Sequence, residues 1–235
     1  TLSCIMDIDK KGDIVGHRIV EGIIRSRRRL TYKYAYALLT DKKTARAEKD
    51  RELVEMLRLM LKLSRLLRKK RQKEGAVDFD FPESVIALDD RGRVTDIHPY
   101  EINDANRLIE DLMLAANETV AKEFCKREVP FLYRVHEAPS EEKAQELISL
   151  VQGLGFPVRR GKAGLSDPRD LSAILKKVEG SPEAPLVEKT ALRSMSKARY
   201  TVECTGHYGL SKKYYTHFTS PIRRYPDLQI HRIIK

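Results

Sequence analysis

The residues best suited to chemistry lie near the C-terminal end of the chain, at 217–228, where the sequence reads HFTSPIRRYPDL. Thr219 or Ser220 can cap a helix there, and Pro221 suits the first helical position. A helix start offers free backbone N–H groups and the positive end of the helix dipole. The segment therefore predicts an anion-binding site.

Two cations in this segment support that interpretation. Arg223 and Arg224 would lie in the first turn of the expected helix, where positive charge opposes the dipole. A bound phosphate would offset the cost, as expected where a functional site breaks a local rule. The alternative is that these arginines pair with Asp227 and other acids.

A second basic segment lies at 25–29, where four arginines precede TYKYAY at 31–36. Arginine beside aromatic rings suits single-stranded nucleic acid, because guanidinium groups pair with phosphates and rings stack on bases. The alternative is a solvated strand end followed by a Tyr-lined core helix. A third basic cluster, 58–73, is best explained as the solvated face of a helix.

The sequence contains no complete set of metal ligands at a suitable spacing. The Asp-rich stretch 7–13 starts like a calcium loop but has Arg18 where a bidentate Glu is needed, so we interpret it as a hairpin turn. Cys204 and His207 form half of a zinc pattern and lack a second pair. No stretch gathers the three or four carboxylates that we expect of a magnesium site.

Composition narrows the class of protein. The 235 residues carry 45 Lys and Arg against 34 Asp and Glu, a net charge of +11 with a pI near 9.5. This balance suggests a polyanionic partner, most often nucleic acid, although solubility alone is the alternative. The apolar runs are too short for a transmembrane helix. Three widely spaced cysteines fit a reducing cytosol, so we expect a cytoplasmic protein.

The elements that must position these residues are a mixture of hairpins and helices. We expect strands at 1–9 and 14–29, a long helix opened by Asp41 or Thr44 and ending near Gly75, a hairpin at 84–98, a helix from Asn103 to Arg127, helices at 140–153, 168–178 and 186–198, and a last helix after Pro221. Without strict alternation of strand and helix, the pattern predicts an α+β fold.

One helix has an unusual face. Asn106, Glu110 and Asn117 recur at helical spacing between 103 and 127, beside small and apolar neighbours. They could be surface residues, or polar groups directed into a cleft.

Five blocks together resemble the RNase II/RNase R family of hydrolytic 3′-to-5′ exoribonucleases, and are closer to its RNase R branch. Before HFTSPIRRYPDL these blocks are TLSCIMDID at 1–9, IRSRRRLTY at 24–32, RLIEDLMLAAN at 107–117, FLYRVHE at 131–137 and GHYGL at 206–210. The resemblance covers nearly the whole chain. It implies that residues 1–235 are a partial RNB catalytic domain, an antiparallel sheet or barrel flanked by helices.

The resemblance also implies roles for residues. Arg223 matches the family's catalytic arginine, which contacts the scissile phosphate. Tyr32 matches a tyrosine at the terminal nucleotides, Glu110 a glutamate that meets the RNA 3′ end, and Phe79 a phenylalanine that stacks under the last bases. The residues expected to bind RNA or to support the Arg223 loop are Arg224, Tyr225, Ser220, Pro221 and Asp227.

Other expectations concern what lies outside this sequence. The chain starts in an apparent strand and stops in an apparent helix, so we expect a fragment of a longer protein. The family's magnesium-binding aspartates lie N-terminal to Thr1, and its cold-shock and S1 domains are absent. We therefore expect a magnesium-dependent parent nuclease and an inactive isolated chain. Single-stranded RNA is the expected partner, without a membrane, and the chain is expected to be a monomer.

Two alternatives remain open. A non-catalytic family member could retain the RNA cleft and lose the metal site. A basic α+β domain whose charge serves only solvation is the third possibility, and failure to bind RNA would favour it.

Overall fold

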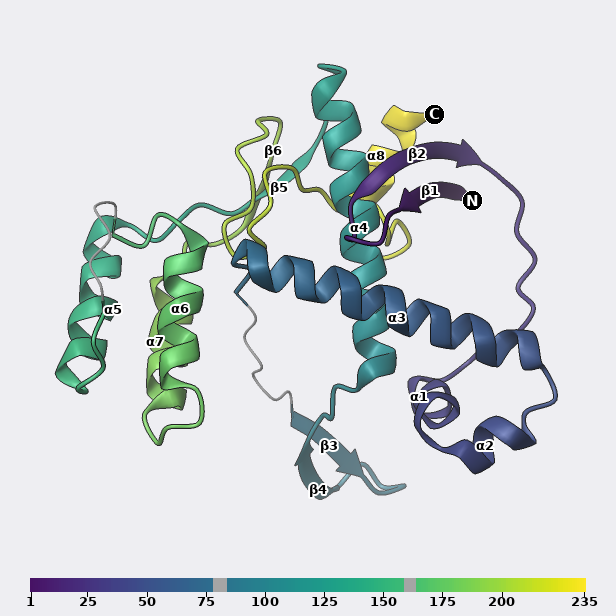
Figure 1. The fold of residues 1–235 in the computed structure, drawn as a ribbon, viewed down its shortest axis with the longest axis horizontal. Coiled ribbons are helices and arrows are strands. Elements are labelled where there is room, and N and C mark those ends of the chain that lie inside the picture. The colour runs from purple at the N-terminus through teal and green to yellow at the C-terminus, as the bar shows by residue number, and fades with distance from the viewer. Residues whose placement is uncertain (78–83, 159–163) are drawn as a thin grey trace. The chain divides into compact units, whose positions relative to one another are not determined.

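The computed structural model describes residues 1–77, 84–158 and 164–235. It divides the chain into two compact units, one formed by 1–25, 66–78 and 111–235 and the other by 26–65 and 79–110. The elements are β1 (Leu2–Ile8), β2 (Ile14–Glu21), α1 (Tyr32–Thr40), α2 (Lys42–Ala47), α3 (Arg51–Glu74), β3 (Ser84–Leu88), β4 (Val94–Pro99), α4 (Asp104–Lys126), β5 (Tyr133–Val135), α5 (Glu141–Gly153), α6 (Pro168–Val178), α7 (Ala184–Ser194), β6 (Arg199–Thr201) and α8 (Tyr225–Ile234) (Figure 1).

The first unit begins with the antiparallel hairpin of β1 and β2, in which Leu2 pairs with Glu21. Gly12 has φ +82° in the connecting turn, a conformation that favours glycine. The prediction of a hairpin is confirmed, but β2 ends at Glu21 and not near Arg29. Residues 22–30 adopt no regular structure, although the alternation of residues continues past Glu21.

The core of the first unit brings α4, β5 and α8 together. Phe124 of α4 stacks on Phe131, with ring centroids 4.6 Å apart. Phe131 is 2% exposed, and burying such a ring contributes about 1.5–3 kcal/mol. Phe218 and Ile230 pack into the same cluster, one on each side of the start of α8. The segment at 217–228 is therefore attached to the core at both ends.

Three helices of the first unit begin and end largely as predicted. Ser140 caps α5 through its hydroxyl, and Asp167 caps α6 with Pro168 in the first turn. The third, α7, runs from Ala184 to Ser194, a few residues earlier than the predicted 186–198. Pro185 lies in its first turn, a position that suits proline, so the helix includes Pro185 and does not start after it.

The second unit contains α1, α2, the start of α3, and the β3–β4 hairpin. Asp41 caps the short helix α2 and not the long one, which begins at Arg51. A small core forms between α3 and α1, because Leu53, Val54 and Leu57 pack with Leu38. The β3–β4 hairpin has the predicted boundaries within a residue.

The predicted α+β class is confirmed. Within the described parts of the chain the strands pair as three two-stranded antiparallel sheets with no closed barrel, accompanied by helices. None of the described helices is both long enough and apolar enough to span a membrane. That residues 1–235 form one partial domain stays a prediction.

Candidate functional site

The arginine segment, residues 217–228, is a turn followed by a helix. The backbone N–H groups of Arg223 and Arg224 both donate to the Ser220 carbonyl, which closes a turn before α8. The helix begins only at Tyr225, with Arg224 as its N-cap residue. The predicted helix start at Pro221 is therefore wrong, and the two arginines precede the helix.

The later helix start changes which charges lie at the positive end of the helix dipole. Pro226 occupies the first turn of α8 and Asp227 adds an acid there, which suits the positive end of the dipole. Arg223 lies on the turn that precedes α8, outside the hydrogen-bonded part of the helix. The proposed conflict between two cations and the dipole is thus smaller than the sequence suggested.

Asp227 anchors the turn. Its side chain is fully buried, and Oδ2 accepts hydrogen bonds from the Ser220 N–H at 2.8 Å and from Arg224 Nη2 at 2.9 Å. The predicted alternative, pairing with Asp227, thus holds for Arg224. A buried, charge-assisted hydrogen bond of this kind stabilises the turn and also restricts its geometry.

Arg223 is the cation that this anchor leaves available. Its side chain is exposed, and it makes no hydrogen bond or ion pair with any described residue. Three buried atoms nearby also have no hydrogen-bond partner among the described residues: Thr219 Oγ1, Arg224 Nε and Asp227 Oδ1. The permanently charged, planar guanidinium of Arg223 suits a phosphate group.

Asn117 of α4 connects the arginine segment to Tyr215 through two hydrogen bonds. Its Oδ1 accepts the Phe218 N–H at 2.9 Å, and its Nδ2 donates to the Tyr215 hydroxyl at 3.2 Å. Asn117 is only 2% exposed. The polar face predicted on this helix was the signal for it, although Asn117 itself was not among the predicted site residues.

His217 and Tyr200 form a second support. The Tyr200 hydroxyl lies 2.6 Å from His217 Nδ1, and the Arg134 guanidinium lies over the Tyr200 ring at 4.8 Å. Burial, then the charge of Arg224, lowers the pKa of His217 to about 4, so the ring is neutral at pH 7. Nothing in the sequence pointed to this pair.

A neighbouring histidine behaves in the same way. Burial, then the proximity of His136, lowers the pKa of His207 to about 3. The His207 ring packs edge-on against Tyr215, which in turn packs against His217. The rings of His207, Tyr215 and His217 therefore form an aromatic cluster that is uncharged at pH 7.

Two predicted site residues belong to the second unit. Tyr32 is the first residue of α1, is 47% exposed, and lines a groove of about 1010 Å³ together with Tyr36, Tyr100 and Arg107. Glu110 lies on α4 and is not among the described lining residues of that groove. Phe79 lies outside the described residues. The remaining predicted site residues all fall in the first unit, within the arginine segment.

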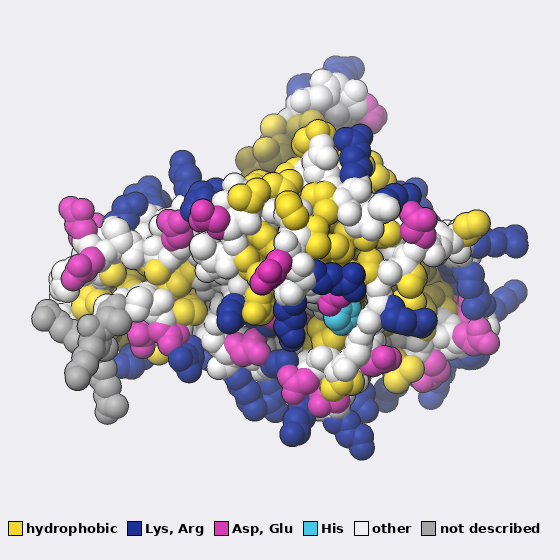
Figure 2. Space-filling model, turned by 90° about the horizontal axis from the view of Figure 1, so that it is seen from above, with side chains coloured by type: hydrophobic (Ala, Val, Ile, Leu, Met, Phe, Trp, Pro, Cys, Tyr) yellow, Lys and Arg dark blue, Asp and Glu magenta, His cyan; other side chains and the backbone are white. Residues whose placement is uncertain are grey.

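The arginines at 25–29 divide into two kinds. Arg28 donates to Glu48 Oε1 at 2.8 Å, and Arg27 pairs with Glu52 at 3.2 Å. Hydrogen bonds from Arg28 and then Tyr34 lower the pKa of Glu48 to about 2. Arg25 and Arg29 are exposed. On the face drawn in Figure 2, Lys and Arg side chains are interspersed with Asp and Glu.

No metal centre can be assembled from the described residues. Among 1–77, 84–158 and 164–235, no group of three or more His, Cys, Asp or Glu could hold an ion. The residues at hand therefore do not fit a magnesium site.

Known proteins give the context for this geometry. The family model for the RNB domain matches residues 1–235. Ribonuclease R of Aquifex aeolicus is 44% identical over 230 residues, covering 98% of this chain and 32% of the relative. The chain spans about a third of the length of the curated relatives it matches.

Solved structures agree. RNase R from Mycoplasma genitalium, in complex with ribose methylated single-stranded RNA, superposes with a TM-score of 0.91 at 31% identity, covering 99% of this chain and 36% of that one. The yeast pseudonuclease Ssd1 superposes at 0.70 and 21% identity, covering 100% of this chain and 28% of its own, which shows the fold alone. The predicted resemblance is confirmed: the chain belongs to the RNB domain family.

Proposed function

We propose that this chain is part of the catalytic domain of a processive 3′-to-5′ exoribonuclease that hydrolyses single-stranded RNA to 5′-nucleoside monophosphates. Family membership and the similarity to RNase R support a ribonuclease. The observation that carries the proposal is the exposed Arg223 guanidinium on a turn anchored by a buried carboxylate. The RNA complex of the M. genitalium protein supports RNA as the partner.

The role of Arg223 follows from its chemistry. Hydrolysis of a phosphodiester concentrates negative charge on the phosphoryl oxygens in the transition state. A guanidinium can donate two parallel hydrogen bonds to those oxygens and cannot lose its proton at neutral pH. Asp227 and Asn117 would act by position, the first by holding Ser220 and Arg224 and the second by holding Phe218. Both keep the turn in place before RNA arrives.

We propose in addition that the longer protein requires Mg²⁺ and that its ligands lie outside the described residues. When bound, the ion would polarise the phosphate and lower the pKa of a water molecule. The described residues do not fit the ion, so we expect the 235-residue chain to bind RNA without cleaving it. We also propose a monomeric, cytoplasmic protein, which sedimentation and cell fractionation would test.

The test is Arg223→Ala in a nuclease-active polypeptide that contains all 235 residues. Loss of a transition-state arginine should lower the turnover rate about 10³-fold or more, with a much smaller change in RNA affinity. Arg232→Ala is the matched control, because Arg232 is exposed on α8 and should leave the rate unchanged. An active Arg223→Ala enzyme would refute the assigned role.

The second candidate is an RNA-binding protein without catalysis. This candidate is supported by the similarity to Ssd1, a pseudonuclease, because the fold alone does not distinguish a nuclease from a pseudonuclease. RNA binding by a longer polypeptide that shows no magnesium-dependent release of mononucleotides would establish this candidate. Failure to bind RNA at low salt would overturn both.

A further inference from the structure

A cavity of about 330 Å³ lies in the first unit, away from the arginine segment in sequence. Its walls come from the β1–β2 turn, the last turns of α3, the middle and end of α4, and Lys212. None of its described lining residues belongs to 217–228. The residues that line it are therefore distinct from Arg223 and its segment.

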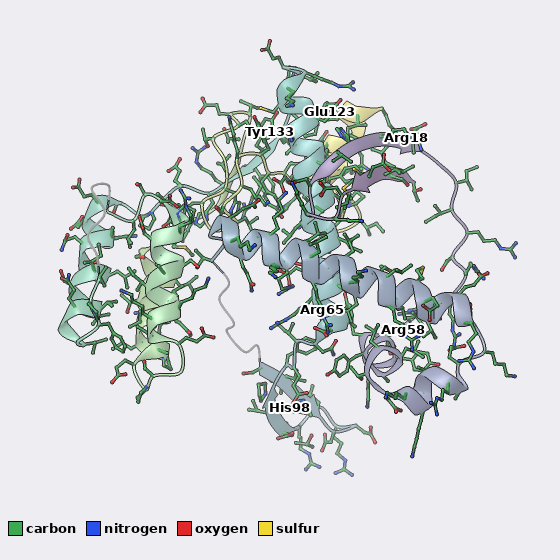
Figure 3. The ribbon with its side chains drawn as sticks, viewed as in Figure 1. Arg18, Arg58, Arg65, His98, Glu123 and Tyr133 are labelled. Carbon is green, nitrogen blue, oxygen red and sulfur yellow. The ribbon has the colours of Figure 1, made fainter. Side chains whose placement is uncertain are left out.

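The hairpin wall is fixed in place by contacts to α3 and to α4. Lys70 of α3 donates to the Gly12 carbonyl at 3.2 Å and to Asp13 Oδ1 at 2.6 Å. On the other side, His17 Nε2 lies 3.1 Å from Glu123 Oε2. Figure 3 shows Glu123 on α4, with β2 and its Arg18 close by. The cavity is thus formed by a hairpin attached at each end to a helix.

Each acidic residue that lines the cavity already has a cationic partner. Asp13 pairs with Lys70, Asp111 with Arg71, Glu118 with Lys212, and Glu123 with Arg127. Lys212 is largely buried between Glu118 and Glu74, and these carboxylates hold its pKa above the usual value despite burial. The acids are consequently neutralised before any ligand binds.

Two lysines remain. Lys122 and Lys126 lie one turn apart on α4, both line the cavity, and both are exposed. Neither makes an ion pair or hydrogen bond with a described residue. The cavity therefore carries surplus positive charge.

We propose that this cavity binds a small phosphate monoester of mononucleotide size, with the phosphate held by Lys122 and Lys126. Lysine ammonium groups bind phosphate as point charges. The volume lies at the lower end of small-molecule pockets, which fits a ligand the size of one nucleotide. The mixed polar and apolar lining suits a ligand with a charged end and a less polar body. Leu67, Leu114 and Ala115 supply the apolar part.

The probes are 5′-AMP, adenosine and inorganic phosphate, titrated into the 235-residue chain by calorimetry and by amide NMR. We expect 5′-AMP to bind one to one, to bind more tightly than phosphate, and to shift the signals of Gly12, His17 and Thr119. Adenosine should bind at least tenfold more weakly than 5′-AMP, because it lacks the charge (about a tenfold loss per 1.4 kcal/mol). Phosphate that binds as tightly as 5′-AMP would overturn the mononucleotide assignment.

The variants separate the charge from the fold. Lys122→Gln combined with Lys126→Gln should weaken 5′-AMP binding about tenfold or more, since each loses a charge-assisted contact. Lys176→Gln combined with Lys189→Gln is the matched control, because both lysines are exposed on α6 and α7 and do not line the cavity. Lys122→Arg combined with Lys126→Arg should retain binding. Equal affinity in the glutamine double variant, or no binding of 5′-AMP at millimolar concentration, would overturn the proposal.

Discussion

The two arginine-rich segments of this chain hold their guanidinium groups in different ways. At 217–228, one arginine is tied to a buried carboxylate and its neighbour is left exposed on a short turn. At 25–29, the chain has no regular structure, and Arg27 pairs with the exposed Glu52 while Arg28 pairs with the buried Glu48. The first arrangement fixes one cation at a defined place, whereas the second spreads several cations along a segment. Catalysis needs the first kind, and binding of a flexible polyanion needs only the second.

The largest effect that tests this contrast is expected from Asp227→Ala. It leaves the Arg224 guanidinium and the Ser220 N–H without their acceptor, so the free energy of unfolding should fall by about 3–5 kcal/mol. Urea denaturation measures this loss. Arg27→Ala is the matched change in the other segment, where an ion pair with both side chains mostly exposed should contribute less than about 1 kcal/mol. Similar losses in the two variants would contradict the comparison.

A smaller loss is expected from Asn117→Ala. The Phe218 N–H and the Tyr215 hydroxyl would both be buried without their partner, which should cost about 2 kcal/mol. Asn106→Ala on the same helix is the control: it loses an exposed bond to the Tyr100 hydroxyl and a partly buried one from the Asn103 N–H, so a smaller loss of about 1 kcal/mol is expected. Thermal unfolding of the two variants decides which polar residue of α4 supports the turn. An equal effect of both would remove Asn117 from the site.

The sequence was sufficient for the parts of the fold that depend on local rules. Ser140, Asp167 and Pro168 begin helices where capping and proline geometry predict them. The boundaries of β3 and β4 followed from the turn at 89–92. These features need no knowledge of distant residues.

Long-range contacts decided what the sequence could not show. SPIRRYPD contains two prolines, and either could start a helix by local preference. The structure starts it at the second, where Asp227 reaches Ser220 and Asn117 fixes Phe218. Partners 101 residues apart leave no pattern in one sequence.

The pH dependence of stability gives a third test. The pKa of His217 is about 4 in the folded chain and about 6.5 in an unfolded one. Because the folded-state pKa is depressed, the unfolded chain binds more protons between these values, and the free energy of unfolding falls as pH drops from 6.5 toward 4. His217→Gln should flatten that slope by at most about 1.4 kcal/mol per pH unit. A slope that His217→Gln leaves unchanged would contradict the assignment of His217 as a buried, neutral ring.

The smallest effect is expected in the spread-out segment. Arg25→Gln combined with Arg29→Gln removes two exposed guanidinium groups that pair with no described residue. If both contact RNA phosphates, the slope of log binding constant against log salt should decrease by about 1.4, since each contact to a single strand contributes about 0.7. Arg27→Gln combined with Arg28→Gln should change that slope less, because these arginines already pair with Glu52 and Glu48. Fluorescence anisotropy with a labelled oligonucleotide at several salt concentrations measures both slopes. A larger change in the Arg27 and Arg28 double variant would contradict this expectation. It would mean that RNA phosphates replace Glu52 and Glu48 as the partners of these two arginines.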